Sequence, residues 1–443
     1  MTKTNDLTVG KVHDVLLSFF FPMLFTNLLQ QLYNFADTVI VGKGIGDNAL
    51  AAVGNMSAMT LLIIGFSQGI TNGFSVIIAQ SFGKGNADEL RKSIAASIKL
   101  SAALSIILSI TSIAVLKKIL MIMQTDRTIL HDSLIYGYSI FGGLTATMTY
   151  NLCSCILRAI GDSKTPFIAI ICSSALNILL DCVFIYVLKT GVGGAAAATV
   201  LSQAIASVIC IMHFRRLQII QLTRNDFKND LALIKTLIKN GIPMALMNSV
   251  TAVGCMIVQA YVNSLGVVYT SAYSVCNKYI NLFMLPAVTA GFTVSAFTGQ
   301  NYGACKYDRI RSGVRMGLII GLVSYAIASG IMLLLPEPLA ELMLSGSSAI
   351  ELTSDFLRIC GCMFFTLNSL FIYRSAVQGM GKPLIPMLSG CMEMILRILI
   401  IALFLPKIGF ISTAYAEISA WIGALLMNII AYKTNAELRE NNE

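Results

Sequence analysis

Long, nearly uncharged stretches recur along the whole chain and constrain its fold more than any other feature. Twelve of them are separated by short polar turns, and each is long enough to cross a bilayer as a helix of about 20 residues. Only 12% of the 443 residues are charged, against about a quarter in soluble proteins. The stretches also lack the alternating pattern of barrel strands. We therefore predict an all-α polytopic membrane protein with twelve transmembrane helices, at 15–41, 49–79, 93–116, 132–157, 166–188, 193–213, 243–265, 271–298, 314–335, 352–377, 386–405 and 410–432.

Lysine and arginine are distributed unevenly between the polar connections. If the N-terminus is cytoplasmic, 20 of the 31 lysines and arginines fall on the cytoplasmic side and 6 on the opposite side. Cytoplasmic loops of membrane proteins carry such an excess. The sequence thus predicts a multi-pass protein of a prokaryotic cell membrane, surrounded by lipid, with both termini in the cytoplasm. The same rule explains the net charge of +9, so we expect no nucleic-acid partner.

The second half of the chain repeats features of the first at a displacement of 220 positions. The segment Gln80–Gly83 reappears as Gln300–Gly303. Further pairs at this displacement are Asp88 and Asp308, Arg91 and Arg311, Gly161 and Gly381, and Pro166 and Pro386. Because each half holds an even number of spans, the halves share one orientation and are related by an axis along the membrane normal. We predict a six-helix lobe at 1–213, a cytoplasmic linker at 214–240 and a second six-helix lobe at 241–443.

Polar side chains lie inside three spans of the first half, at similar depths. Measured from the outer surface, Asp37 is expected at ~6 Å, Thr199 at ~9 Å and Asp181 at ~11 Å. Asn177 lies one helical turn before Asp181, on the same face. These oxygen ligands suit a small cation, and without one the two carboxylates repel each other unless a proton is taken up. The pattern favours a coupling-ion site; the alternative is that these groups only hydrogen-bond within the lobe.

Other polar groups within the spans are less specific. Gln30, Tyr33 and Asn34 precede Asp37 and could line a substrate cleft, as Gln259 and Lys278 could in the second half. A helix–helix hydrogen bond for Gln259 and a lysine reaching the interface are the structural alternatives. Glu393 and Arg397 stand four residues apart and could simply neutralise each other, so their role stays open.

Several motifs together resemble the multidrug and toxic compound extrusion (MATE) family, over nearly the whole chain. No motif is decisive alone, but their order and spacing are specific. The matching segments are Pro22 with Asp37–Gly42, Leu50–Gly54, Gln80–Gly85, Leu157–Pro166, Asn177 with Asp181, and Gly194–Thr199. The resemblance implies a two-lobed antiporter that exports cationic, amphipathic drugs in exchange for Na⁺ or H⁺. It also implies a cation site in the N-terminal lobe, made by Asp37, Asn177, Asp181 and Thr199. Some relatives have a carboxylate on span seven, where this chain has Gln259.

The leading hypothesis is therefore cation-coupled drug efflux by alternating access, with small-molecule drugs as substrates. We expect a monomer that needs no cofactor and no metal beyond a Na⁺ at the cation site. The alternative is a flippase for a lipid-linked saccharide or another lipid, which should carry more buried lysine or arginine to hold phosphates. A channel or receptor is a third possibility, which the internal duplication disfavours. The chain has no Walker A, HExxH or nucleophile-elbow motif, so we predict that it is not an enzyme.

Overall fold

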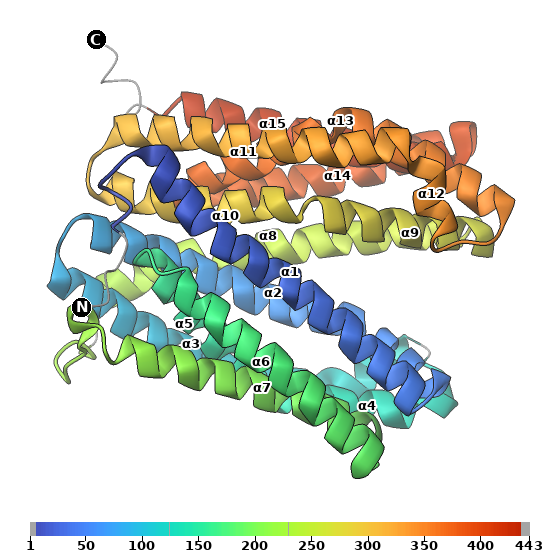
Figure 1. Cartoon of the computed structure of the whole chain (residues 1–443), viewed down its shortest axis with the longest axis horizontal. Coiled ribbons are helices and arrows are strands. Elements are labelled where there is room, and N and C mark those ends of the chain that lie inside the picture. Colours follow the sequence, from blue (N-terminus) through green and yellow to red (C-terminus); the bar gives the residue numbers. More distant parts are fainter. Residues whose placement is uncertain (1–5, 124, 229, 436–443) are drawn as a thin grey trace. The chain divides into compact units, whose positions relative to one another are not determined.

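A computed structural model describes residues 6–123, 125–228 and 230–435, which form helices joined by short connections (Figure 1). In the first half the helices are α1 (Val12–Gly44), α2 (Asp47–Gly83), α3 (Ala87–Ile122), α4 (Arg127–Gly142), α5 (Leu144–Ala159), α6 (Lys164–Cys182) and α7 (Gly191–Phe214). In the second half they are α8 (Leu231–Asn263), α9 (Val267–Phe283), α10 (Leu285–Gly303), α11 (Tyr307–Leu334), α12 (Pro336–Glu341), α13 (Ser347–Gly379), α14 (Leu384–Ile408) and α15 (Ser412–Lys433).

The described helices supply the predicted number of spans. Nine stretches are long and apolar enough to cross a membrane, and two bent pairs raise the number to eleven. The longest of these stretches, Leu384–Lys433, contains two helices, α14 and α15, which pack along each other, so it supplies two spans and the number becomes twelve. The bent pairs are α4 with α5, at 45°, and α9 with α10, at 42°. Each bent pair corresponds to one predicted span, at 132–157 and at 271–298.

Side-chain caps and prolines explain several helix boundaries and breaks. Asn86 accepts a hydrogen bond from the Glu89 backbone N–H at 3.1 Å and so caps α3. Asp230 accepts from the Leu233 N–H at 3.1 Å, and α8 therefore begins at Leu231, inside the predicted linker. Pro22 and Pro243 lie inside α1 and α8, where each removes one backbone hydrogen bond of the helix.

Left-handed backbone conformations repeat at the same displacement as the sequence. Gly85 has φ 71°, and its counterpart Cys305 has φ 54° although it is not glycine. Each such residue turns the chain between two helices, where a positive φ lets the backbone reverse sharply. The other pairs displaced by 220 are Gly46 and Gly266, Gly161 and Gly381, and Lys189 and Gly409. The two halves therefore repeat the geometry of their turns, even where the residue type has changed.

Contacts divide the described chain into two units. One holds Phe21–Ala245, and the other holds Leu7–Phe20 together with the described residues from Leu246 onward. Both boundaries fall inside a helix, close to Pro22 in α1 and close to Pro243 in α8. The predicted lobe limits at 213 and 241 stay a prediction.

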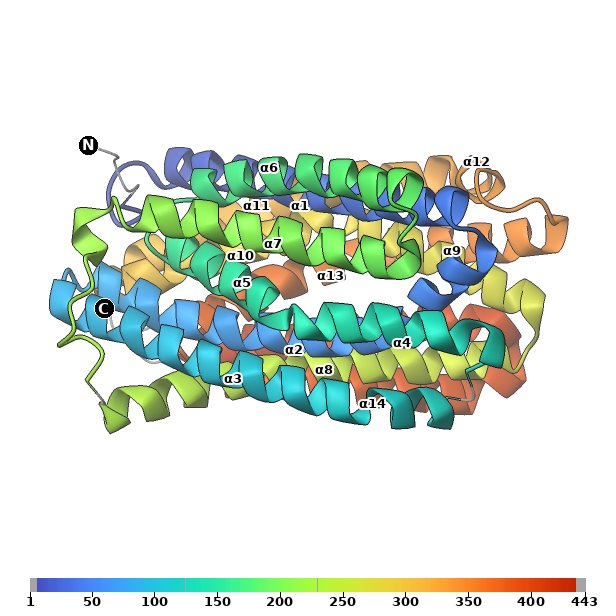
Figure 2. The same ribbon diagram turned by 90° about the horizontal axis from the view of Figure 1, so that it is seen from below.

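Each unit has its own apolar core. In the first unit, α2 and α8 approach closely, because a Cβ added to Gly73 would lie 2.5 Å from the Gly241 Cα. Small residues at such crossings let helix backbones pack in the membrane. In the second unit, aromatic rings pack edge to face, including Phe364 against Trp421 with ring centroids 6.0 Å apart. In the first unit α6 also lies beside α7 in both views (Figure 1, Figure 2), which places their polar residues near each other.

Candidate functional site

The centre of the candidate site is on α6, where two polar side chains are fully buried. Asn177 is 1% exposed and Asp181 is 0% exposed. Among the residues that the structure describes, no hydrogen-bond partner reaches the amide of Asn177 or either carboxylate oxygen of Asp181. Polar atoms buried in this way cost free energy unless a partner compensates them. The two side chains, four residues apart, therefore form a site that a cation or a proton would complete.

The carboxyl group of Asp37, on α1, lies next to that of Asp181. The two groups interact electrostatically, and they are close enough for one to donate a hydrogen bond to the other when it carries a proton. Asp37 is partly buried, and within the described chain its Oδ1 has no partner. Two carboxylates this close in a low-dielectric region repel each other strongly. The pair therefore needs a shared proton or a bound cation.

Two tyrosines lie near this carboxyl pair, and two glutamines interact with one of them. Tyr33, one turn before Asp37, interacts with the side chains of Gln30 and Gln203 and lies near both aspartates. Tyr136 of α4 is also near Asp37 and Asp181. Sequence reasoning named Gln30 and Tyr33 but missed Tyr136 and Gln203. The signal for Gln203 was its position one turn after Thr199 on a helix that already carried a candidate ligand.

Thr199 and Asn34 occupy more peripheral positions. The Thr199 hydroxyl donates to the Ala195 carbonyl of its own helix at 3.1 Å, which leaves its oxygen lone pairs free to face a ligand. Asn34 is exposed. The structure thus brings Asp37 and Asp181 together, with Asn177 one turn away on α6.

A π-helical turn follows the site directly. The α-helical part of α6 ends at Cys182, and Val183–Val187 continue as a π-helix, with the Leu188 N–H donating to the Val183 carbonyl at 2.9 Å. Such turns are rare and occur often at functional sites, because they shift the register of the side chains that follow. Here the turn lies between the ligand-bearing part of α6 and the connection to α7.

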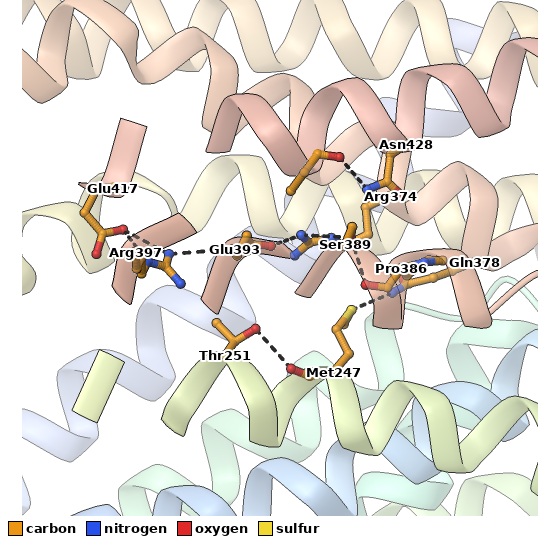
Figure 3. Close-up of polar contacts among 11 residues, drawn as sticks. Met247, Thr251, Arg374, Gln378, Pro386, Ser389, Glu393, Arg397, Glu417 and Asn428 are labelled. Carbon is orange, nitrogen blue, oxygen red and sulfur yellow. Dashed lines mark hydrogen bonds and ion pairs between the residues drawn. The ribbon is translucent and has the colours of Figure 1, made fainter. Parts of the chain in front are cut away.

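The second unit contains a different arrangement of buried charge, which Figure 3 shows in close-up. Arg374 of α13, Glu393 and Arg397 of α14 and Glu417 of α15 form one chain of ion pairs. The Arg397 Nη2 lies 3.5 Å from a Glu393 oxygen and 2.9 Å from a Glu417 oxygen, and Arg374 pairs with the other Glu393 oxygen. All four side chains are less than 10% exposed. The pair of Glu393 and Arg397 considered from the sequence is present, and two further partners neutralise it from other helices.

The remaining candidate residues of the second unit are outside this network. The Gln259 amide donates to the Asn263 side chain at 2.8 Å on the same helix. Lys278 is exposed. At the displacement of 220, Asn177 corresponds to Arg397 and Asp181 to the buried Ile401. The two halves are therefore alike in scaffold and different in chemistry.

This architecture defines a class of protein. A chain of twelve membrane-crossing helices in two repeated halves, with unsatisfied carboxylates buried in one half, has the design of a secondary transporter.

The chain belongs to the MatE family, whose model matches residues 22–183 and 243–403. It is 27% identical over 376 residues to the probable multidrug resistance protein YoeA of Bacillus subtilis, covering 83% of this chain and 81% of that protein. It is 31% identical over 310 residues to the probable multidrug resistance protein YpnP of the same organism, covering 70% and 69%.

Solved structures of this family share the fold. A crystal structure of MATE in the bent conformation covers 100% of this chain and 99% of that one, with a TM-score of 0.93 at 20% identity. The predicted family and the predicted all-α fold of twelve spans in two six-helix lobes are confirmed. The protein is a membrane transporter.

Proposed function

We propose that the protein is a secondary active exporter of cationic or amphipathic drugs, driven by inward movement of Na⁺ or H⁺. The observation that carries this proposal is the pair of adjacent carboxyl groups of Asp37 and Asp181, whose buried oxygens have no hydrogen-bond partner among the residues that the structure describes. The names of the relatives YoeA and YpnP support drugs as the substrate class.

In this proposal, ion and drug transport are coupled because the cation and the cationic drug compete for the negative charge of the Asp37 and Asp181 pair. When Na⁺ or H⁺ neutralises the Asp37 and Asp181 pair, the site loses its attraction for a cationic drug and the repulsion between its carboxylates. Binding energies of ion and drug are linked reciprocally, so a cation that lowers drug affinity is itself bound less tightly when drug is present. Entry of the cation from outside would therefore favour drug release on that side, and its departure into the cytoplasm would restore drug binding.

The alternative function, a lipid-linked saccharide flippase, needs positive charge to hold phosphate. Arg374 and Arg397 are the buried basic residues of the ion-pair chain, and Glu393 and Glu417 balance their charge. This pairing favours drug export over phosphate recognition.

Drug uptake into inside-out vesicles tests the proposal. Ethidium accumulation should follow an imposed Na⁺ gradient, an imposed pH gradient or both, and Asp37→Asn or Asp181→Asn should reduce the coupled rate by at least about tenfold, because either change removes half of the carboxyl pair. Asp47→Asn, an exposed aspartate in the first turn of α2, is the matched control and should transport normally. Wild-type efflux in both site variants would refute the proposal.

A further inference from the structure

A cavity lies within the first unit, bounded by α3, α5, α7 and the segment that follows α7. Its volume is about 650 Å³. Its walls are mainly apolar, and representative lining residues are Ile98 and Ala102 of α3, Met148 and Ile156 of α5, and Ile211 and Phe214 of α7. None of the candidate cation ligands borders it, so its contents are independent of the proposed drug export.

The cavity has the depth of one leaflet. Its lining on α5 runs from Thr145 to Ile156, and the eleven helical steps between them, at ~1.5 Å each, make roughly 16 Å. Half of a hydrocarbon core of ~30 Å is about the same length. Arg215 and Gln221 line its mouth, at the face that the charge distribution predicts to be cytoplasmic. This cavity, called the slot below, has the depth needed for an acyl chain that reaches from the inner surface toward the bilayer centre.

The helices that wall the cavity present apolar side chains outward. On α7 these recur about once per turn, and the exposed residues are Leu201, Ile205, Val208 and Met212. On α3, Ala102 and Ala103 are exposed, as are Ile106 and Ile110 beyond them. Such surfaces on spanning helices face lipid, so acyl chains are the molecules that can enter the slot from the side.

Charge at the mouth of the slot selects the headgroup. Arg215, at the end of α7, is the one charged residue among those that line the cavity in the described chain, and Gln221 adds an uncharged hydrogen-bonding group. Basic pockets between spanning helices on the cytoplasmic side hold anionic headgroups. We propose that this cavity is a binding site for one anionic phospholipid of the inner leaflet, with an acyl chain in the slot and its phosphate beside Arg215.

Native mass spectrometry of the purified full chain tests this site, with phosphatidylglycerol and phosphatidylcholine of identical acyl chains as probes. Wild-type protein should retain one phosphatidylglycerol about fivefold more tightly than phosphatidylcholine, as expected for one basic residue at a membrane surface. Arg215→Gln should bring the two affinities together. Arg216→Gln, which changes an exposed arginine beside the cavity, is the matched control and should preserve the preference.

Filling the slot tests the acyl-chain site separately. Ala102→Phe should abolish retention of both lipids, whereas Ala103→Phe, on an exposed residue that does not line the cavity, should not. A phosphatidylglycerol with a photoreactive acyl chain should cross-link within 98–102 and 148–156. Equal lipid retention by the two phenylalanine variants would overturn the proposal, and so would displacement of the lipid by ethidium or by inorganic phosphate alone. Arg215→Gln alters only an exposed side chain, so it keeps the proposal testable if Ala102→Phe does not fold.

Discussion

At the scale of the residue, the chain handles buried charge in two opposite ways. Asp181 is fully buried with both carboxylate oxygens unpartnered in the described chain, whereas Arg397 contacts two glutamates from two helices. A buried charge without a counter-charge destabilises the fold, so it persists where function needs it. The ion-pair chain of the second unit balances two arginines with two glutamates, whereas the carboxyl pair of the first unit has no counter-charge in the described chain. This difference assigns the coupling ion to the first unit in our proposal.

Binding of a cation at the Asp37 and Asp181 pair should raise the thermal stability of the protein. In detergent, the thermal midpoint of the wild-type protein should rise when Na⁺ is added at high pH, or when the pH falls without Na⁺, because either change relieves repulsion between Asp37 and Asp181. A ligand at 100 times its Kd stabilises the folded state by about 2.7 kcal/mol. Asp181→Asn should lose the response and Asp47→Asn should keep it. Identical responses in all three proteins would rule out a cation site at this pair.

The stability of the protein should depend on the charge balance within the ion-pair chain of the second unit. Arg397→Met leaves Glu417 buried without its partner and should cost about 3–5 kcal/mol of stability. The double variant Arg397→Met, Glu417→Gln removes the stranded charge and should recover most of that loss. Thermal unfolding of the two variants in detergent measures the difference, and a double variant no more stable than the single one would contradict this account.

At the scale of the element, the duplicated halves preserve backbone conformation more strictly than residue type. Gly85 and Cys305 occupy the same left-handed turn, and Lys189 corresponds to Gly409. The bends are not preserved, since α4 with α5 corresponds to the unbroken α13, and α9 with α10 to the unbroken α2. The two halves therefore share the backbone conformation of the turns between helices, whereas the bending of individual helices differs between them.

A glycine of this scaffold can be tested against a glycine inside a helix. Gly85→Ala should destabilise the protein by about 1 kcal/mol, because a side chain at φ 71° is strained although no atom lies within 4 Å of the added Cβ. Gly330→Ala, in the interior of α11 with equally open surroundings, should instead stabilise by about 0.5–1 kcal/mol. Thermal unfolding measures both changes, and a loss of equal size at the two positions would show that φ is not the cause.

At the scale of the whole molecule, the boundaries of the two contact units do not coincide with the boundary between the two repeated halves of the sequence. Leu7–Phe20 belong by contact to the second unit. Arg309 donates to the carbonyls of Gly10 at 2.8 Å and Leu7 at 3.1 Å, and the Leu7 N–H donates to Gln300 at 2.9 Å. The segment Leu7–Phe20 is therefore held by the second half of the sequence, and after it the chain passes into the first unit within α1.

This attachment predicts a change in hydrogen exchange. Arg309→Met removes charged hydrogen bonds worth about 1.5–3 kcal/mol each, so amide exchange over 7–10 should accelerate by about tenfold or more. Arg315→Met, at an exposed arginine further along α11, is the control and should leave this exchange unchanged. Unaltered exchange in Arg309→Met would show that other contacts hold the segment.

The sequence by itself determined the number and order of the spans, the duplication and the presence of Asp37 and Asp181 at similar depths in one half. These features depend on local hydropathy and on residue types at a fixed displacement, which can be read along one dimension. The early start of α8 at Leu231, by contrast, lay in a polar segment without a hydropathy signal.

Only the tertiary structure decided which distant side chains meet. Arg374 and Glu417 join Glu393 and Arg397 from separate helices. From two further helices, Tyr136 approaches the carboxyl pair and Gln203 approaches the neighbouring Tyr33. The bends within 127–159 and 267–303 were also absent from the sequence pattern. Hydropathy shows that a helix crosses the membrane, but its rotation and bending, which choose the partners of each buried polar group, are set by packing against the other helices.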